Sequence, residues 1–266
     1  RAAPEAAGAA ASGAAAFGPA AHFWMSLHPP HIQGSRAAEG TYWFLSDRIR
    51  AYRKSHCNPA FQTTVAALAE AGRGRPGALS LVDVGAHLGD CCLWAVARLG
   101  PRRVRCLAVE ADAETAQAIR LSAELNNFGE SLRVLPSMVG DGPLDCAPGA
   151  GGVVRGDCVL DAWGPADLVN IHTSHASEGQ VLESFATSLY GRRVGVWLLR
   201  TVDLPPARVH LFVQRNSLNY FAETFRDGSN TRLVERGRAQ LAGLAANVTR
   251  PRGSAGVDQW RWRPLG

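Results

Sequence analysis

Residues 81–90 read LVDVGAHLGD, a short apolar run that passes through two glycines into a helix-like pattern. The apolar run predicts a buried strand, and the apolar positions after it recur at helical spacing up to Gly100. Gly85 permits a sharp turn and removes a side chain that would keep a ligand away, and Gly89 does the same where the helix begins. Free N–H groups at a helix start favour an anionic group. The segment therefore predicts a strand, a tight turn and a helix that a ligand approaches closely.

The same unit occurs again along the chain, and this repetition sets the fold class. Asp112 is a suitable N-cap for a helix that follows a second predicted strand. Predicted strands lie at residues 104–109, 132–135, 168–171 and 194–199. Strands that alternate with helices imply a parallel sheet covered by helices on both faces. We therefore expect a Rossmann-like, doubly wound α/β fold with a mostly parallel sheet.

Glu110 stands at the predicted end of the second strand. An acidic side chain at that place can accept hydrogen bonds from both hydroxyl groups of a ribose. A dinucleotide site would need the pattern GxGxxG, but His87 and Asp90 occupy the positions of its second and third glycines when counted from Gly85. The spacing here is GxxxG instead. We therefore expect a nucleoside ligand other than NAD.

Asp83, the GxxxG turn and the acid of the second strand together resemble the cofactor motifs of class I methyltransferases. More narrowly, the chain resembles the FkbM family, whose pattern DVGAN-x-G corresponds to DVGAHLG here. The resemblance also includes AVEADAE at the second strand, the pair Leu160-Asp161 and the strand at residues 169–171. It spans about residues 23–235 and implies S-adenosyl-L-methionine as the cofactor.

The resemblance assigns cofactor-binding roles to individual residues. Glu110 would hold the ribose, and the residues of the first turn would surround the methionine part. These turn residues are Asp83, Gly85, Ala86, His87 and Gly89, of which His87 departs from the usual Asn of the family. Asp141, in a Gly/Pro-rich loop after the third strand, is a candidate acceptor for the adenine amino group, although acids are common in such loops.

The end of the fourth core strand departs from the family pattern. FkbM-like proteins read Lys-Ile-Asp-x-Glu-Gly there, whereas this chain reads NIHTSH at residues 170–175, so the lysine and both acids are absent. His172 is the candidate general base, because imidazole titrates near neutral pH and could take a proton from an acceptor hydroxyl. Alternatively, His172 and His175 are polar residues at a strand end. A zinc site that included His87 would lack further ligands, so we expect no metal.

Two functions follow from these observations. The first is O-methylation of a small-molecule or sugar hydroxyl by an FkbM-like, S-adenosylmethionine-dependent enzyme. The second is a catalytically decayed methyltransferase-like domain that binds a nucleoside or serves as an interaction module, since the strand-four set is missing. The acceptor does not follow from the sequence, because variable segments and loops form such pockets.

Charge and hydropathy narrow the expected partners. A net charge of +5 would suit a nucleic-acid partner, but the basic residues are almost all Arg and are scattered rather than gathered into a tract. No segment approaches the roughly 20 apolar residues of a membrane helix. We therefore expect a small-molecule or glycan acceptor, no nucleic acid and no membrane contact. The oligomeric state stays open.

The six cysteines show no CxxC pair and no metal-ligand spacing. The preference of cysteine for protein interiors predicts reduced, largely buried thiols. The cytoplasm is slightly favoured as the compartment. The chain starts at Arg1 rather than Met, and we expect the N-terminus to be incomplete.

The length of 266 residues fits one elaborated domain. Residues 1–22 are rich in alanine and glycine and predict a disordered lead-in. We expect a single domain over the rest of the chain, residues 23–266. In chain order its parts are an N-terminal helical extension at 23–78, a cofactor-binding core at 79–203, and antiparallel strands that complete the sheet within 204–266.

Overall fold

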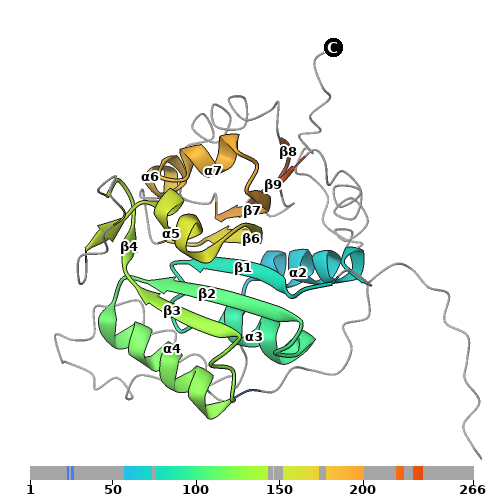
Figure 1. Ribbon diagram of the computed structural model, residues 1–266, viewed down its shortest axis with the longest axis vertical. Coiled ribbons are helices and arrows are strands. Elements are labelled where there is room, and N and C mark those ends of the chain that lie inside the picture. Colours follow the sequence, from blue (N-terminus) through green and yellow to red (C-terminus); the bar gives the residue numbers. More distant parts are fainter. Residues whose placement is uncertain are drawn as a thin grey trace, which may run out of the picture.

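A seven-stranded sheet forms the centre of the computed structural model, with strand order β3-β2-β1-β6-β7-β9-β8 (Figure 1). The strands are β1 (Leu79–Val84), β2 (Val104–Glu110), β3 (Leu132–Pro136), β6 (Ala166–Ile171), β7 (Val194–Arg200), β8 (Tyr220–Thr224) and β9 (Asn230–Glu235). Neighbouring strands are parallel from β3 to β7, and β9 runs antiparallel to both β7 and β8. The predicted mostly parallel sheet with antiparallel C-terminal strands is confirmed.

Six helices accompany the sheet in the described part of the chain: α2 (Pro59–Ala71), α3 (Asp90–Leu99), α4 (Ala113–Leu125), α5 (Gly156–Trp163), α6 (Glu178–Glu183) and α7 (Ala186–Tyr190). The caps explain where the longer helices start. The Asn58 side chain accepts a hydrogen bond from the Ala60 amide at the start of α2. Asp112 accepts one from the Thr115 amide at 2.7 Å, which confirms its predicted role as the N-cap of α4.

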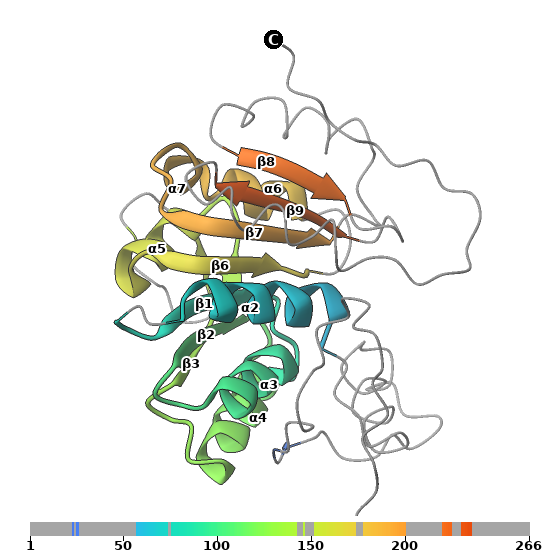
Figure 2. The ribbon, with the colours of Figure 1, turned by 90° about the vertical axis from the view of Figure 1, so that its right-hand side faces the viewer.

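Two hydrophobic clusters lie on opposite faces of the sheet. Successive strand residues point to opposite faces, so Leu81 belongs to one cluster and Val82 to the other. The first cluster is covered by α2, α3 and α4, and the second by α5, α6 and α7. Figure 2 shows α2 and α3 in front of one face of the strands. Because helices cover both faces, the doubly wound arrangement is confirmed.

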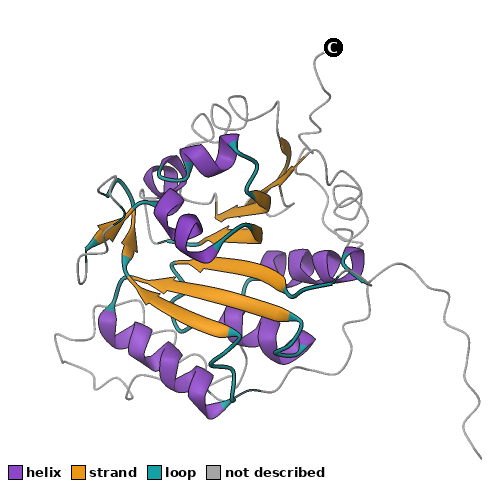
Figure 3. Cartoon of the chain, in the orientation of Figure 1, coloured by secondary structure: helices purple, strands orange, loops and turns teal. Residues whose placement is uncertain are grey.

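The structure describes residues 23, 25–26, 57–73, 76–142, 146, 152–173, 178–200, 220–224 and 230–235, which are coloured in Figure 3. The expected lead-in at residues 1–22 lies outside them. The boundaries proposed within the chain remain predictions. None of the helices in the described ranges has both the length and the apolar character needed to cross a membrane.

The region after β3 contains elements that the sequence pattern did not predict. A short parallel pair, β4 (Met138–Val139) and β5 (Val153–Val154), flanks the predicted Gly/Pro-rich loop, and α5 follows it. Between β6 and β7 the chain forms two helices, α6 and α7, with a break between them. Ser184 lies at the break, where its hydroxyl donates to the Val181 carbonyl and accepts from the Gly156 amide. Such local bonds compete with helix continuation.

The prediction of reduced thiols is wrong. The six cysteines form three disulfide bonds, Cys57–Cys91, Cys92–Cys106 and Cys146–Cys158. Neighbouring residues of a helix point about 100° apart, so Cys91 and Cys92 reach different partners. The partners are 34 and 14 positions away along the chain, and the fold brings them close. The predicted burial is found for all except Cys146, which is partly exposed.

Candidate functional site

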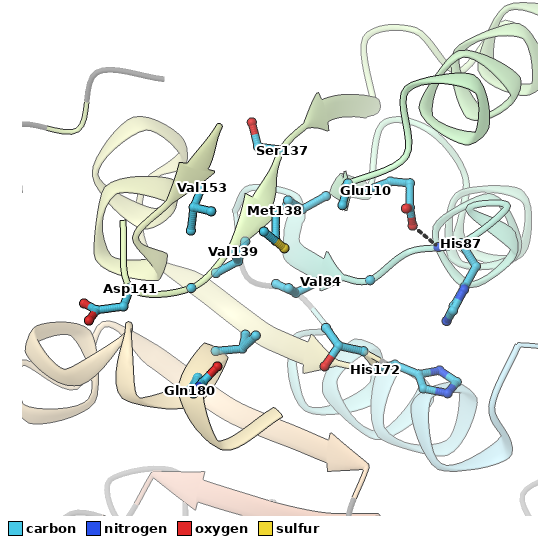
Figure 4. A pocket seen from close by; sticks show the side chains of 16 residues that line it. Val84, His87, Glu110, Ser137, Met138, Val139, Asp141, Val153, His172 and Gln180 are labelled. Atoms are coloured by element: carbon cyan, nitrogen blue, oxygen red, sulfur yellow. Dashed lines mark hydrogen bonds between the residues drawn. The ribbon is translucent and has the colours of Figure 1, made fainter. Parts of the chain in front are cut away.

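The chain reverses its direction of travel across the sheet between β1 and β6. From β1 it moves outward through β2 to β3, and it later returns through β6 to β7 on the other side. Ligands of such sheets bind outside the carboxyl ends of the strands at this switch point. A cavity of about 340 Å³ lies there, lined by the ends of β1, β2 and β6 together with β4, β5 and the start of α6 (Figure 4).

Glu110 is the acid of this cavity. It ends β2, is only 2% exposed, and lines the cavity wall. Its Oε2 accepts a hydrogen bond from the His87 amide at 2.9 Å, drawn in Figure 4, and its Oε1 accepts one from the Asp112 amide at 2.9 Å. A carboxylate offers about four lone-pair sites, so each oxygen can accept more than one hydrogen bond. Two backbone amides therefore fix the position of this carboxylate at the cavity wall.

The turn after β1 depends on left-handed backbone conformations. Gly85, His87 and Gly89 have φ values of 73°, 52° and 72°. A Cβ on Gly85 would lie 2.3 Å from the carbonyl oxygen of His172, and one on Gly89 would lie 2.7 Å from Cγ2 of Ile119. The glycines are thus required by close packing of the protein itself. Their role in leaving room for a ligand stays a prediction.

Asp83 is buried next to the turn, one residue before the end of β1. It is 2% exposed and accepts a hydrogen bond from Asn170 Nδ2 at 2.7 Å. Burial raises the pKa of this carboxyl to about 7, with smaller contributions from the charges of Asp90 and Glu110, while the Asn170 bond acts in the opposite direction. Asp83 is therefore close to half-protonated at neutral pH. Asp83 does not line the cavity wall.

His172 lies at the end of β6 beside His87. Their ring centroids are 5.2 Å apart in an edge-to-face arrangement. Arg200, at the end of β7, has Nη1 2.8 Å from Nε2 of His172. Because a guanidinium can only donate, Nε2 is the acceptor and the ring proton lies on Nδ1. His172 and Arg200 thus pair across the carboxyl ends of β6 and β7.

This environment keeps both histidines neutral. Burial lowers the pKa of His172 to about 3, and the nearby His87 and Arg200 add to the shift. Burial also lowers the pKa of His87. At neutral pH the His172 ring is therefore uncharged, and its unprotonated nitrogen is engaged by Arg200. General-base action at that nitrogen would require the bond to Arg200 to open.

Asp141 lies at the opposite end of the cavity from His87 (Figure 4). Its side chain is 95% exposed and forms an ion pair with Arg155, with 3.3 Å between Oδ1 and Nη1. The structure therefore brings four predicted cofactor residues and the predicted base to one cavity: Gly85, His87, Glu110, Asp141 and His172. The remaining three, Asp83, Ala86 and Gly89, lie in or beside the turn but not on the wall.

Sequence reasoning missed several residues of the cavity and its edge. Ser137, Met138 and Gln180 line the wall, and Arg200 pairs with His172. Met138 is a large apolar side chain that is 52% exposed beside the cavity. Its place directly after a strand end is the signal that could have identified it. Among the described residues, no group of three or more His, Cys, Asp or Glu side chains could hold a metal ion.

No protein-family model matches the chain, and no curated protein matches its sequence. Similar solved structures include a precorrin-6y C5,15-methyltransferase from Geobacter metallireducens, with 15% identity over 68% of this chain and 89% of that one and a TM-score of 0.42. TrmK of M. capricolum in complex with S-adenosyl-homocysteine shows 11% identity over 67% of each chain, with a TM-score of 0.40.

The methyltransferase FkbM from Methylobacillus flagellatus shows 16% identity to this chain and a TM-score of 0.45. The match covers 59% of this chain and 43% of that chain, so less than half of the FkbM structure has a counterpart here. These distant likenesses concern the fold alone.

Proposed function

We propose that this chain is an S-adenosylmethionine-dependent methyltransferase of the FkbM type that methylates a hydroxyl group on a small molecule or glycan. The observation that carries the proposal is Glu110, a buried carboxylate fixed by two backbone amides at the wall of a switch-point cavity. A buried charge is costly unless it is paired and hydrogen-bonded, and the two amides supply such bonds. A carboxylate at the end of the second strand is the group that can accept hydrogen bonds from the two neighbouring hydroxyl groups of a ribose.

The other residues of the cavity suit the rest of this cofactor. Met138 and Val139, on the side of β3, offer apolar surface for a flat base, and Asp141 lies at that end for an exocyclic amino group. The turn at Gly85 and His87 lies on the side of β1, where the methionine part would lie. When bound, the cofactor supplies a methyl group on a sulfonium centre.

We place the acceptor hydroxyl beside His172. Methyl transfer depends mainly on alignment of the donor and the nucleophile, and a base assists when the nucleophile is a hydroxyl. Burial and the contact with Arg200 disfavour protonation of His172, so it can act as a base only if Arg200 leaves Nε2 as the acceptor binds. The acceptor would therefore have to compete with His172 for the guanidinium. This exchange gives Arg200 a role in orienting the base.

A second candidate is a domain that binds the cofactor or another nucleoside without catalysis. Two observations favour it: the strand-four residues lack the lysine and acids of the FkbM pattern, and the acceptor nitrogen of His172 is occupied by Arg200. In that case Glu110 would still bind a ribose. Methyl transfer would be absent.

The test is calorimetry with S-adenosylhomocysteine on the wild type and on Glu110→Gln. Gln cannot accept the hydrogen bonds of both backbone amides and both hydroxyl groups, so we expect affinity to fall about 10- to 100-fold. Glu114→Gln, an exposed change in the first turn of α4, is the matched control and should bind like the wild type. Absence of binding by the folded wild type would refute the proposal.

Radiolabelled S-adenosylmethionine separates the two candidates. Methyl transfer to a panel of hydroxyl-bearing small molecules and glycans, with loss of turnover in His172→Ala and unchanged S-adenosylhomocysteine affinity, supports the enzyme. Cofactor binding without transfer to any acceptor supports the binding module.

A further inference from the structure

The Cys92–Cys106 bond joins the two elements that carry the candidate cofactor site. Cys92 is the third residue of α3, directly after the turn that contains Gly85, and Cys106 lies in β2, the strand that ends in Glu110. Both cysteines are fully buried in the first hydrophobic cluster. The bond therefore fixes how far the start of α3 lies from the strand that presents the carboxylate.

The other two bonds also attach to segments around the cavity. Cys57–Cys91 ties the second residue of α3 to the segment before α2. Cys146–Cys158 ties α5 to the chain that follows Asp141. All six cysteines of the chain are used in this way. None of the six cysteines lines the cavity, and the Cys146–Cys158 bond involves neither α3 nor β2.

A binding site functions best when its residues are held in place before the ligand arrives. Glu110 accepts a bond from the His87 amide, so its position depends on the turn, and the turn leads directly into α3. A covalent link between α3 and β2 restrains this arrangement. Loss of the link would remove this restraint and leave the turn held to β2 by hydrogen bonds, including those from the Gly85 and Ala86 amides to the Val109 carbonyl.

We propose that the Cys92–Cys106 bond positions the turn of Gly85 against Glu110, so that the cavity binds its cofactor fully only in the oxidised chain. The protein accordingly belongs to an oxidising compartment, where disulfides form and persist. This inference rests on the proposed function. It extends the finding that the cysteines are disulfide-bonded, and it favours a compartment other than the cytoplasm.

The oxidation is a balanced thiol–disulfide exchange. The two thiols of Cys92 and Cys106 lose two protons and two electrons and form one S–S bond. A disulfide of an oxidoreductase or of a small thiol takes up the electrons and protons and is left as two thiols. The same exchange with an excess of a reduced dithiol reverses the step.

Peptide mapping without reduction tests the bonds themselves. The native chain, alkylated before digestion, should yield no alkylated cysteine, one Cys146–Cys158 pair, and one cluster of three peptides, because the adjacent Cys91 and Cys92 stay on one peptide that is joined to those of Cys57 and Cys106. Alkylation of Cys92 and Cys106 in the native chain overturns the inference. This result does not depend on any ligand.

Cofactor affinity tests the positioning role. We expect the double variant Cys92→Ala/Cys106→Ala to bind S-adenosylhomocysteine at least 10-fold more weakly at a temperature where its circular dichroism matches the wild type. Cys146→Ala/Cys158→Ala is the matched control, with one bond lost and the α3–β2 link intact, and should change affinity less than threefold. Equal affinities in both double variants would assign the bond a stabilising role only and overturn the proposal.

Hydrogen exchange keeps the inference testable if no cofactor binds or if the variant does not fold. Mild reduction of the wild type should increase amide exchange in residues 84–92 before it does so in β6 and β7. Unchanged exchange in residues 84–92 after Cys92–Cys106 is reduced would contradict the inference. Failure of the wild type to bind S-adenosylhomocysteine would count against the proposed function alone.

Discussion

The two sides of the cavity are built in different ways. On the side of β1 and β2, backbone amides hold Glu110, and the glycine turn packs against protein atoms with no space to spare. On the side of β6 and β7, the contact between His172 and Arg200 joins two side chains. The first side is thus fixed by the path of the backbone, whereas the second can change by exchange of side chains.

The two sides also respond to pH in opposite directions. Asp83, next to the turn, has a raised pKa in the folded state, so its contribution to stability decreases as pH rises from its unfolded value toward 7. His172 has a lowered pKa, so its contribution decreases as pH falls below its unfolded value of about 6.5. Substitution of Asp83 should remove the loss of stability at rising pH, and substitution of His172 should remove the loss at falling pH.

The largest effect should come from Gly85→Ala. The φ of 73° is unfavourable for alanine, and the new Cβ would meet the His172 carbonyl oxygen at 2.3 Å. We expect the free energy of unfolding to fall by about 4 kcal/mol or more, measured by urea denaturation. Gly100→Ala is the matched control, because φ is 92° but nothing lies within 4 Å; it should cost only about 1–2 kcal/mol. Equal losses in the two variants would show that the two halves of the sheet do not meet closely at Gly85.

Asp83→Asn should stabilise the protein at alkaline pH. A carboxyl whose pKa rises from 3.8 to about 7 destabilises the fold by roughly 4 kcal/mol above pH 7, where it is charged. The amide oxygen of the variant can still accept the Asn170 hydrogen bond. The gain should therefore be large at pH 8 and small near pH 4, as measured by denaturation across that range. Glu114→Gln serves as the exposed control, and a gain that does not depend on pH would contradict the raised pKa of Asp83.

His172→Gln should flatten the acid arm. With a pKa of about 3 in the folded chain, His172 stays neutral while the unfolded chain takes up a proton, which costs about 3 kcal/mol between pH 6.5 and pH 4. Gln cannot be protonated, yet its carbonyl oxygen can accept from Arg200. Thermal denaturation of both proteins at pH 4, 5, 6 and 7 measures the difference. Parallel curves would show that His172 titrates normally and that Arg200 does not engage it in solution.

The smallest effect is expected at His87. Asn is the residue usual in FkbM-like proteins at this place, and both Asn and His tolerate the left-handed region in which His87 lies at φ 52°. His87→Asn should change the free energy of unfolding by less than about 0.5 kcal/mol. His87→Val, with a branched Cβ, should lose about 1–2 kcal/mol. A loss of similar size in both variants would mean that the imidazole itself, and not the backbone conformation, stabilises the turn.

Local patterns were sufficient to predict the strands of the sheet and the residues at the ends of β1 and β2. The turn at 85–89 and the acid at Glu110 are each encoded within a few neighbouring residues, so their placement followed from strand ends alone. Asp112 as a cap is equally local. The strand order itself and the antiparallel end of the sheet agree with the expected Rossmann-like class.

Features that depend on register or on distant partners could not be predicted. Arg200 reaches His172 because β6 and β7 pair with Ile171 opposite Leu199, a register that neither strand reveals by itself. The helix α5 follows a Gly/Pro-rich segment, and its Asp157 accepts from the amides of Thr187 and Ser188 far along the chain. Disulfide partners are likewise set by the fold, because cysteine spacing does not specify connectivity.

The backbone contact between Gly85 and the His172 carbonyl has a consequence for how a chain like this can diversify. Every L-amino acid at 85 would push the two halves apart, whichever side chain follows at the end of β6. Substitutions at 172 and 200 are free of that restriction, because the contact between these two residues joins side chains. Side chains at the ends of β6 and β7 can therefore vary during evolution while the glycine turn after β1 stays unchanged.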